Sequence, residues 1–374
     1  MVLVDKHAFP RDKACGDALL PDALKALDRL ELKPRVLAEA VRTSRLRIYA
    51  PDRTFVDLGG EFACLPRYLF DNLLREAAVA AGAQFASPYR LVTPVFDGGL
   101  VSGARVRNDR NKDEIVIRAK VTVLATGAAA GPLLLFGVCE HRRPFAVAAR
   151  VYVTTDLEFA SRFDFLCISY DRLLCPGYGW IFPGPDGVFN IGVGYFYDVP
   201  SRPLVSNLRT LLDVFLLHFP LAREVMERAR SVTAPKGAPL RTAMRGATLS
   251  QPGLLIVGEA AGLTYSLSGE GIGKAMESGL IAADAIGEAL GESPDAVLHA
   301  GQRYRERLVA EFSERFRAYE IAQRWIATPG VANFLAWRAR RGAYVRRQLE
   351  GLLTETSDPR DLFSARGLIL SLAR

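Results

Sequence analysis

A glycine-rich segment in the second half of the chain constrains the fold most strongly. A short apolar strand predicted over Leu254–Val257 runs directly into Gly258-Glu259-Ala260-Ala261-Gly262. A second cluster, Gly269-Glu270-Gly271-Ile272-Gly273, then opens a helix predicted to continue to about Leu290. Glycines let backbone N–H groups approach a ligand, and a helix N-terminus favours negative charge. The pattern predicts a nucleotide-type α/β unit, although a tight strand–helix turn without a ligand needs the same glycines.

Further α/β pieces occur at the start of the chain. The apolar spacing predicts strands over Val2–Val4 and Val121–Leu124, and helices over Pro21–Leu32 and Pro66–Ala81. Between residues 142 and 245, β-rich pieces with Pro and Gly breaks replace this pattern, and the end of the chain is helical and amphipathic. We therefore predict an α/β fold with three parts: a discontinuous nucleotide-binding domain over 1–141 and 246–295, an inserted β-rich substrate domain over 142–245, and a helical C-terminal region over 296–374.

Two polar segments near the start are candidates for a site. Arg11-Asp12-Lys13-Ala14-Cys15-Gly16-Asp17 surrounds a single cysteine with charged residues just after a strand. Arg67 stands at the start of the predicted second helix, where a guanidinium can reach a phosphate or a flavin. An exposed loop with an incidental thiol remains the alternative for the first segment.

An aromatic segment lies in the β-rich part. Tyr178, Trp180 and Phe182 alternate with other residues, so on a strand all three side chains lie on one face. Gly177 and Gly179 then fall on the opposite face and leave room for close packing. The aromatic face could hold an apolar substrate, or it could simply belong to the core.

Together, and in this order, the four segments resemble the geranylgeranyl reductase family of flavoproteins, which has the p-hydroxybenzoate hydroxylase-type fold. The resemblance covers nearly the whole chain. Asp12-Lys13-Ala14-Cys15-Gly16-Asp17 is similar to the family's D-K-x-C-G-D loop. The stretch from Tyr178 to Gly192 is similar to its Y-x-W-x-F-P-x6-N-x-G motif. The resemblance implies a Rossmann-like FAD-binding domain and a flavin-dependent oxidoreductase.

The resemblance also implies roles for individual residues. Cys15 would lie near the flavin, and it is the single candidate for a catalytic residue. The residues implied in FAD binding are Asp5, Cys15, Gly16, Ala18, Arg67, Leu91, Glu259, Gly271 and Ile272. The residues implied in lining an isoprenoid cavity are Tyr178, Trp180, Phe182, Pro183, Asn190 and Gly192.

The chain departs from the family pattern at three places. Glu259 stands where aspartate is commoner, and Ser266 replaces a proline of the flavin loop. The sequence contains no G-x-G-x-x-G, the loop that cradles the pyrophosphate in the family. The resemblance therefore implies an FAD-binding domain truncated at its N-terminus, with two exposed strand edges. We expect a mis-set start or a truncated gene, lacking roughly 30 residues, rather than a working short form.

The net charge and the composition limit the kinds of partner that we expect for this chain. Of the net charge of +7, the segment from Arg303 to Glu350 carries +6, with 11 arginines and 5 glutamates. We expect either a solvated helical face or attraction to a diphosphate or an anionic membrane surface, and we expect no nucleic-acid partner. The 5 cysteines show no metal-type spacing, which predicts no metal site and reduced thiols in the cytoplasm. No apolar run approaches the roughly 20 residues that span a bilayer.

Three functions are compatible with these residues. The first is reduction of C=C bonds in a prenyl (geranylgeranyl-type) lipid or diphosphate, with FAD as cofactor and NAD(P)H or ferredoxin as electron donor. The second is a flavin monooxygenase or halogenase of the same fold, because a halogenase W-x-W-x-I-P element is somewhat similar to Tyr178–Pro183. The third is a non-catalytic remnant that cannot hold FAD.

Overall fold

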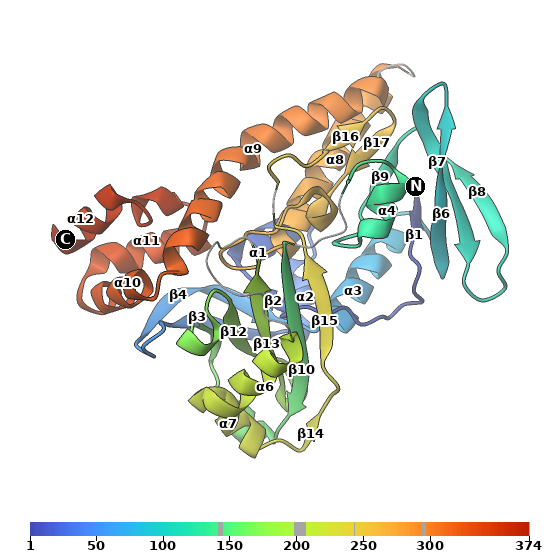
Figure 1. The fold of residues 1–374 in the computed structure, drawn as a ribbon. Helices are drawn as coiled ribbons and strands as arrows, with labels where there is room; N and C mark the ends of the chain where they lie inside the picture. The colour runs from blue at the N-terminus through green and yellow to red at the C-terminus, as the bar shows by residue number, and fades with distance from the viewer. Residues whose placement is uncertain (141–144, 198–206, 243, 294–296, 374) are drawn as a thin grey trace.

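A nine-stranded sheet forms the centre of the molecule (Figure 1). The computed structural model describes residues 1–140, 145–197, 207–242, 244–293 and 297–373. The sheet runs in the order β14-β10-β13-β12-β11-β3-β4-β2, and β15 also pairs with β10. Its strands are β2 (Ala18–Leu19), β3 (Val41–Tyr49), β4 (Phe55–Cys64), β10 (Ala146–Thr154), β11 (Phe165–Ser169), β12 (Tyr178–Pro183), β13 (Val188–Phe196), β14 (Ser231–Val232) and β15 (Lys236–Leu240).

The sheet extends beyond the segment predicted as the substrate domain. β11 pairs in parallel with β3, and β3 pairs with β4 in antiparallel, so residues 41–64 continue the sheet of residues 146–196. One face of the sheet is covered by α6 (Leu208–His218) and α7 (Pro220–Glu227), whose buried residues include Leu212, Phe215 and Val225. The sequence did not predict β3 and β4. The predicted boundaries at 141/142 and 295/296 lie outside the described residues, so the domain limits stay a prediction.

The nucleotide-type part contains two separate groups of parallel strands. β1 (Val2–Val4) pairs only with β5 (Gln84–Ala86), and β9 (Thr122–Leu124) pairs only with β17 (Leu254–Ile256), within the part of the chain that the structure describes. Val2 and Val123 are each 43% exposed. The two exposed strand edges that the sequence analysis predicted are thus present. β16 (Ser250–Gln251) pairs with the other side of β17.

A third small sheet and several helices complete this part. β6 (Tyr89–Asp97), β7 (Leu100–Asn108) and β8 (Glu114–Arg118) form an antiparallel sheet. The helices are α1 (Pro21–Arg29), α2 (Lys33–Glu39), α3 (Arg67–Ala80), α4 (Ala130–Leu135), the short α5 (Leu157–Ala160) and α8 (Ile272–Glu292). The helices predicted over Pro21–Leu32 and Pro66–Ala81 and from Gly271 onward are confirmed.

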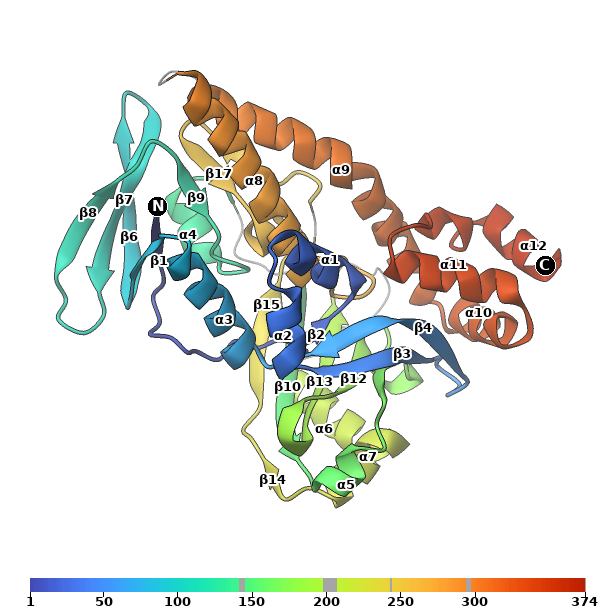
Figure 2. The ribbon, with the colours of Figure 1, turned by 180° about the vertical axis from the view of Figure 1, so that it is seen from behind.

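The C-terminal helices run from beside β17 to the end of the molecule opposite the β6–β8 sheet (Figures 1 and 2). They are α9 (Val297–Ile326), α10 (Pro329–Arg341), α11 (Ala343–Leu353) and α12 (Ala365–Ala373). Residues of α9, α10 and α11, among them Phe316, Leu335 and Leu352, belong to the largest core cluster together with β17. None of the described helices combines the length and the apolar character that crossing a membrane requires.

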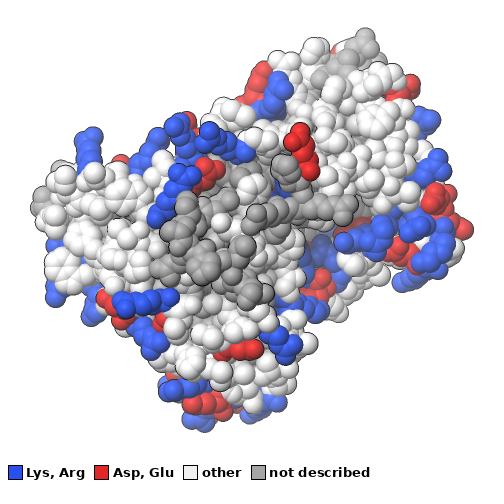
Figure 3. Space-filling view, viewed as in Figure 1, with Lys and Arg blue, Asp and Glu red and all other residues white. Residues whose placement is uncertain are grey.

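The basic excess of the segment from Arg303 to Glu350 is partly neutralised by acidic residues outside that segment. Arg303 and Arg307 pair with Glu288 and Glu292 of α8, and Arg315 pairs with Glu355. Figure 3 shows basic and acidic side chains interspersed over one face of the molecule. Association with an anionic membrane surface stays a prediction.

Candidate functional site

Three of the four predicted segments meet at the side chain of Asp17. Asn190 of β13 donates from Nδ2 to Asp17 Oδ2 at 2.6 Å and to the Cys15 carbonyl at 2.8 Å. Tyr152 of β10 donates its hydroxyl to the same Asp17 oxygen at 2.6 Å. The backbone N–H of Arg67 donates to the other oxygen at 3.3 Å. Asp17 therefore joins the cysteine loop, the predicted flavin-contacting helix and the sheet.

The backbone and charge of Asp17 are both unusual. Its φ is +68°, a left-handed conformation that aspartate and asparagine tolerate better than most residues. The side chain is 1% exposed. Burial raises the pKa of Asp17 to about 6, although the hydrogen bonds from Tyr152 and Asn190 act in the opposite direction.

This raised pKa makes stability depend on pH in a defined direction. The folded protein holds the Asp17 proton more tightly than the unfolded chain does, so the stabilisation is complete below about pH 4. It is lost as the pH rises through about 6. As the pH rises from about 4 through about 6, the unfolding free energy of wild type should fall by about 3 kcal/mol more than that of Asp17→Asn. Urea denaturation measures both. Asp97→Asn, at an exposed position, is the control and should leave the dependence of unfolding free energy on pH as in wild type. Parallel pH profiles for wild type and Asp17→Asn would refute the raised pKa of Asp17.

The aromatic segment forms a continuous row against the cysteine loop. Tyr178, Trp180 and Phe182 are 5–7% exposed, and the ring centroids of successive members lie 6.0 and 6.4 Å apart. A Cβ atom at Gly16 would lie 3.1 Å from the Phe182 ring, so the loop packs directly on the row. The prediction that the three side chains share one face is confirmed; their contact with a substrate stays a prediction.

Glycines permit the close packing around this row. A Cβ atom at Gly179 would lie 2.5 Å from the Phe215 ring, and one at Gly177 would lie 2.0 Å from the Gly194 carbonyl. On the aromatic side, a Cβ atom at Gly192 would lie 2.2 Å from the Trp180 ring. Trp180 donates its indole N–H to Asn190 Oδ1 at 2.9 Å. The predicted substrate residues Asn190 and Gly192 therefore hold Trp180 in place.

A chain of ion pairs connects the predicted FAD residues at the start of the protein. Arg67 binds both oxygens of Asp71, at 2.5 and 2.8 Å, and Arg11 binds one of them at 2.7 Å. Arg11 also lies 3.6 Å from Asp5, at the end of β1. Burial alone would lower the pKa of Arg67, but the neighbouring Cys15 and Asp71 side chains raise it. The structure thus places Asp5, Cys15 and Arg67 in one cluster.

Glu259 lies where β17 ends and reaches toward the same cluster. Its carboxylate is 4.0 Å from Lys13 Nζ and accepts a long hydrogen bond, 3.4 Å, from the backbone N–H of Arg241. A Cβ atom at Gly127, after β9, would lie 3.7 Å from this carboxylate. Burial raises the pKa of Glu259, and the Lys13 cation opposes that shift.

The groups present here fit the sugar and ring portions of FAD. The Glu259 carboxylate can accept hydrogen bonds from the hydroxyl groups of a sugar. The helix α8 begins at Ile272, directly after Gly271. Ser266 Oγ and Arg241 Nε are buried and have no hydrogen-bond partner among the described residues, so both remain available to a ligand. Glu259, Lys13, Gly271 and Ile272 would hold the cofactor. These residues supply no glycine cradle for the pyrophosphate.

An apolar cavity of about 100 Å³ borders the loop that precedes α8. Its walls come from β3 and β4 on one side and from α9–α11 on the other, with Leu46, Leu58 and Leu335 among the lining residues. The predicted flavin loop contributes Leu267, Ser268 and Glu270. Tyr170 links the cavity to the aromatic row, because its ring lies 5.9 Å from that of Tyr178.

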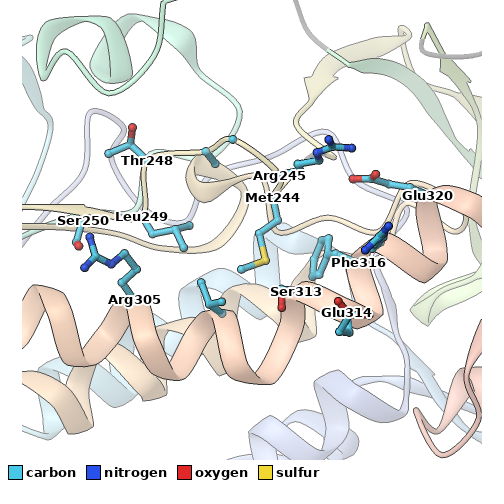
Figure 4. Close-up of a pocket in the computed structure, with 14 residues that line it drawn as sticks. Met244, Arg245, Thr248, Leu249, Ser250, Arg305, Ser313, Glu314, Phe316 and Glu320 are labelled. Carbon is cyan, nitrogen blue, oxygen red and sulfur yellow. The ribbon is translucent and has the colours of Figure 1, made fainter.

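A second, larger groove of about 640 Å³ lies between the loop 244–250 and α9. Figure 4 shows Met244 and Phe316 within it, and Arg245 and Arg305 at opposite ends. None of the residues that the sequence predicted for the site lines this groove.

Not every predicted residue joins the network. Leu91 lies on β6 in the separate three-stranded sheet and takes no part in the hydrogen bonds described above. Ala18 and Pro183 lie on β2 and β12 of the large sheet. The sequence analysis gave no role in the site to Asp71, Tyr152 or Tyr170, and it named Glu270 only as part of a glycine-rich cluster.

Sequence comparison finds relatives among known reductases. No protein-family model matches the chain. A menaquinone reductase of Mycolicibacterium smegmatis is 30% identical over 303 residues, which is 76% of this chain and 69% of that protein. A digeranylgeranylglycerophospholipid reductase of Thermoplasma volcanium is 27% identical over 342 residues, covering 85% of this chain and 78% of that protein.

Solved structures share the fold over the whole chain. A geranylgeranyl bacteriochlorophyll reductase-like protein of Thermoplasma acidophilum has a TM-score of 0.75 at 21% identity and covers 100% of this chain and 89% of its own. A flavin-dependent brominase has a TM-score of 0.70 at 18% identity, covering 100% and 91%. The fold alone therefore does not separate reductases from halogenases. The sequence relationship to the reductases, joined to motifs that meet in one network, places this chain in the geranylgeranyl reductase family of FAD-dependent oxidoreductases.

Proposed function

We propose that the protein reduces isolated C=C bonds in the prenyl chain of a lipid. The observation that carries this proposal is the apolar cavity, because it is walled largely by aliphatic and aromatic side chains and borders the predicted flavin loop at Leu267–Glu270. A prenyl chain is apolar and offers no group for a hydrogen bond along its length. Such a substrate suits a cavity of this composition.

The size of the cavity indicates how much of a substrate it takes. Ligand pockets commonly measure roughly 300–1,000 Å³, and this cavity measures about 100 Å³. It accommodates a short segment of a chain rather than a whole geranylgeranyl group. The remainder of a long substrate must extend past the cavity or displace side chains that line it.

The protein's own contribution is to position the alkene and to exclude water. Bound FAD, once reduced, supplies the hydride. The leucine and isoleucine side chains of β3, β4 and α9–α11 keep solvent away from the reacting bond. Gly271 and Ile272 at the start of α8 would hold the ring system beside the cavity. Tyr170 would form the wall between the cavity and Tyr178 of the aromatic row.

The test is anaerobic product analysis. We expect FAD-loaded protein, reduced chemically, to be reoxidised by a lipid that carries an unsaturated geranylgeranyl chain, with one pair of hydrogens added per bond reduced. A lipid of the same head group with a fully saturated chain is the matched control and should not reoxidise the flavin. Mass spectrometry of the products decides the outcome.

The same experiment addresses the monooxygenase or halogenase alternative. That chemistry stops without O₂ and leaves oxygen or halogen in the product. Turnover that requires air, or a product that contains a new heteroatom, would overturn the proposal. Protein that binds no flavin at saturating FAD, by absorbance, would support the non-catalytic alternative instead.

A further inference from the structure

Glu270 is the only carboxylic acid among the described residues that line the apolar cavity. It lies deep in the protein yet retains some accessible surface, because it faces the cavity. The next two residues, Gly271 and Ile272, are predicted to contact the flavin ring. Glu270 thus lines the space assigned to the alkene and directly precedes the residues predicted to contact the cofactor.

We propose that Glu270 supplies the proton that completes the reduction of the C=C bond, an inference that rests on the proposed function. The π bond of the alkene breaks, and one carbon receives the hydride equivalent of the reduced cofactor. The other carbon receives the proton from the Glu270 carboxyl, whose O–H bond breaks. The resulting carboxylate regains a proton from solvent, which restores the starting state.

The surroundings of Glu270 keep this proton in place at neutral pH. Burial raises the pKa of Glu270 to about 8, and the Asp22 and Glu355 carboxylates add to the shift. The Lys274 cation lowers the pKa of Glu270 and would stabilise the carboxylate that forms after proton transfer. The titratable groups that face Glu270 are Asp22 on α1, Lys274 on α8, Tyr170 after β11, Tyr178 on β12, Tyr319 on α9 and Glu355 after α11.

The other acidic groups nearby are worse placed to donate. The hydroxyl of Tyr170 donates to the Leu267 carbonyl at 3.2 Å, and that of Tyr178 donates to the Ser268 carbonyl at 2.8 Å. Burial raises the pKa of both tyrosines, which makes them weaker acids. Cys15 does not line the cavity.

The test compares Glu270→Gln with Glu270→Asp and with Glu277→Gln. Glu277 also contacts Lys274, at 2.5 Å, but does not line the cavity, so it controls for a lost carboxylate near that lysine. We expect Glu270→Gln to slow anaerobic reoxidation of reduced flavin by the prenyl lipid about 10²–10⁴-fold. Glu270→Asp should recover part of the rate, and Glu277→Gln should keep the wild-type rate.

The pH profile separates a proton donor from a structural residue. The wild-type rate should fall as the pH rises through about 8, since the carboxyl must be protonated to donate. The residual rate of Glu270→Gln should not show this fall. Lipid affinity, measured by perturbation of the flavin spectrum, should change little in either Glu270 variant.

An infrared measurement tests the proton without cofactor or substrate. The difference spectrum of wild type minus Glu270→Gln should contain the C=O band of a protonated carboxylic acid at neutral pH, and the band should vanish at alkaline pH. Absence of the band, or a Glu270→Gln variant with normal rate and pH profile, overturns the role of Glu270 and leaves the proposed function standing. Wild-type protein that reduces no prenyl lipid overturns both.

Discussion

Replacing Lys274 by methionine is expected to lower the unfolding free energy by about 3–5 kcal/mol, the range for removing one partner from a buried ion pair. Lys274 is fully buried, and its Nζ lies 2.7 Å from Glu355, 2.5 Å from Glu277 and 3.7 Å from Asp22. Methionine has a similar volume but removes the cation that these carboxylates share, so Asp22 and Glu277 lose their ion-pair partner while Glu355 retains Arg315. Urea denaturation at neutral pH measures the loss.

A matched lysine on the surface provides the control. Lys33 pairs with Glu61 at 2.8 Å, and the two side chains are 25% and 47% exposed. Lys33→Met should therefore cost no more than about 1 kcal/mol. The penalty of Lys274→Met should also shrink at acidic pH, where the carboxylates gain protons. Equal penalties for the two variants, or a Lys274→Met penalty that is independent of pH, would contradict the role of this cluster.

Replacing Trp180 by alanine is expected to cost about 3–5 kcal/mol, because it empties a buried site that Gly16 and Gly192 pack against. Trp180→Phe keeps most of the volume but leaves the buried Asn190 Oδ1 without its donor, at a cost of about 1–3 kcal/mol. Since Trp180 packs on Tyr178, whose ring lies 5.9 Å from that of the cavity residue Tyr170, we expect this variant to change the chain-length preference on prenyl lipids while it retains flavin. Thermal unfolding and product analysis measure the two effects.

Trp337 is the control for the tryptophan series. It lies on α10 and is 44% exposed, so Trp337→Ala creates no buried cavity and should cost far less than Trp180→Ala. A Trp180→Phe variant with wild-type stability and wild-type selectivity would show that neither the Asn190 hydrogen bond nor the aromatic row has the role described.

Local sequence determined most of the secondary structure around the site and the chemistry of its motifs. Alternation alone placed Tyr178, Trp180 and Phe182 on one face, because side chains on a strand point to opposite sides in turn. The glycine-rich segment predicted the start of α8 for a similarly local reason, since close backbone approach needs residues without a Cβ atom. The absence of G-x-G-x-x-G predicted the separation of β1 from β9, because strand order in this fold follows from connectivity.

Only the tertiary structure decided which distant groups meet. Asp17 and Asn190 are separated by 173 positions in the chain, yet they share a hydrogen bond that no spacing rule predicts. The β3–β4 hairpin joins the large sheet through β11, so one wall of the cavity comes from a segment for which the sequence predicted no strand. The sequence alone showed Glu270 only as one residue of a glycine-rich cluster. Its cavity position and its retained proton depend on burial beside Asp22 and Glu355, which come from opposite ends of the chain. Burial and long-range charge are properties of the packed molecule, whereas alternation and glycine spacing are already present in the extended chain.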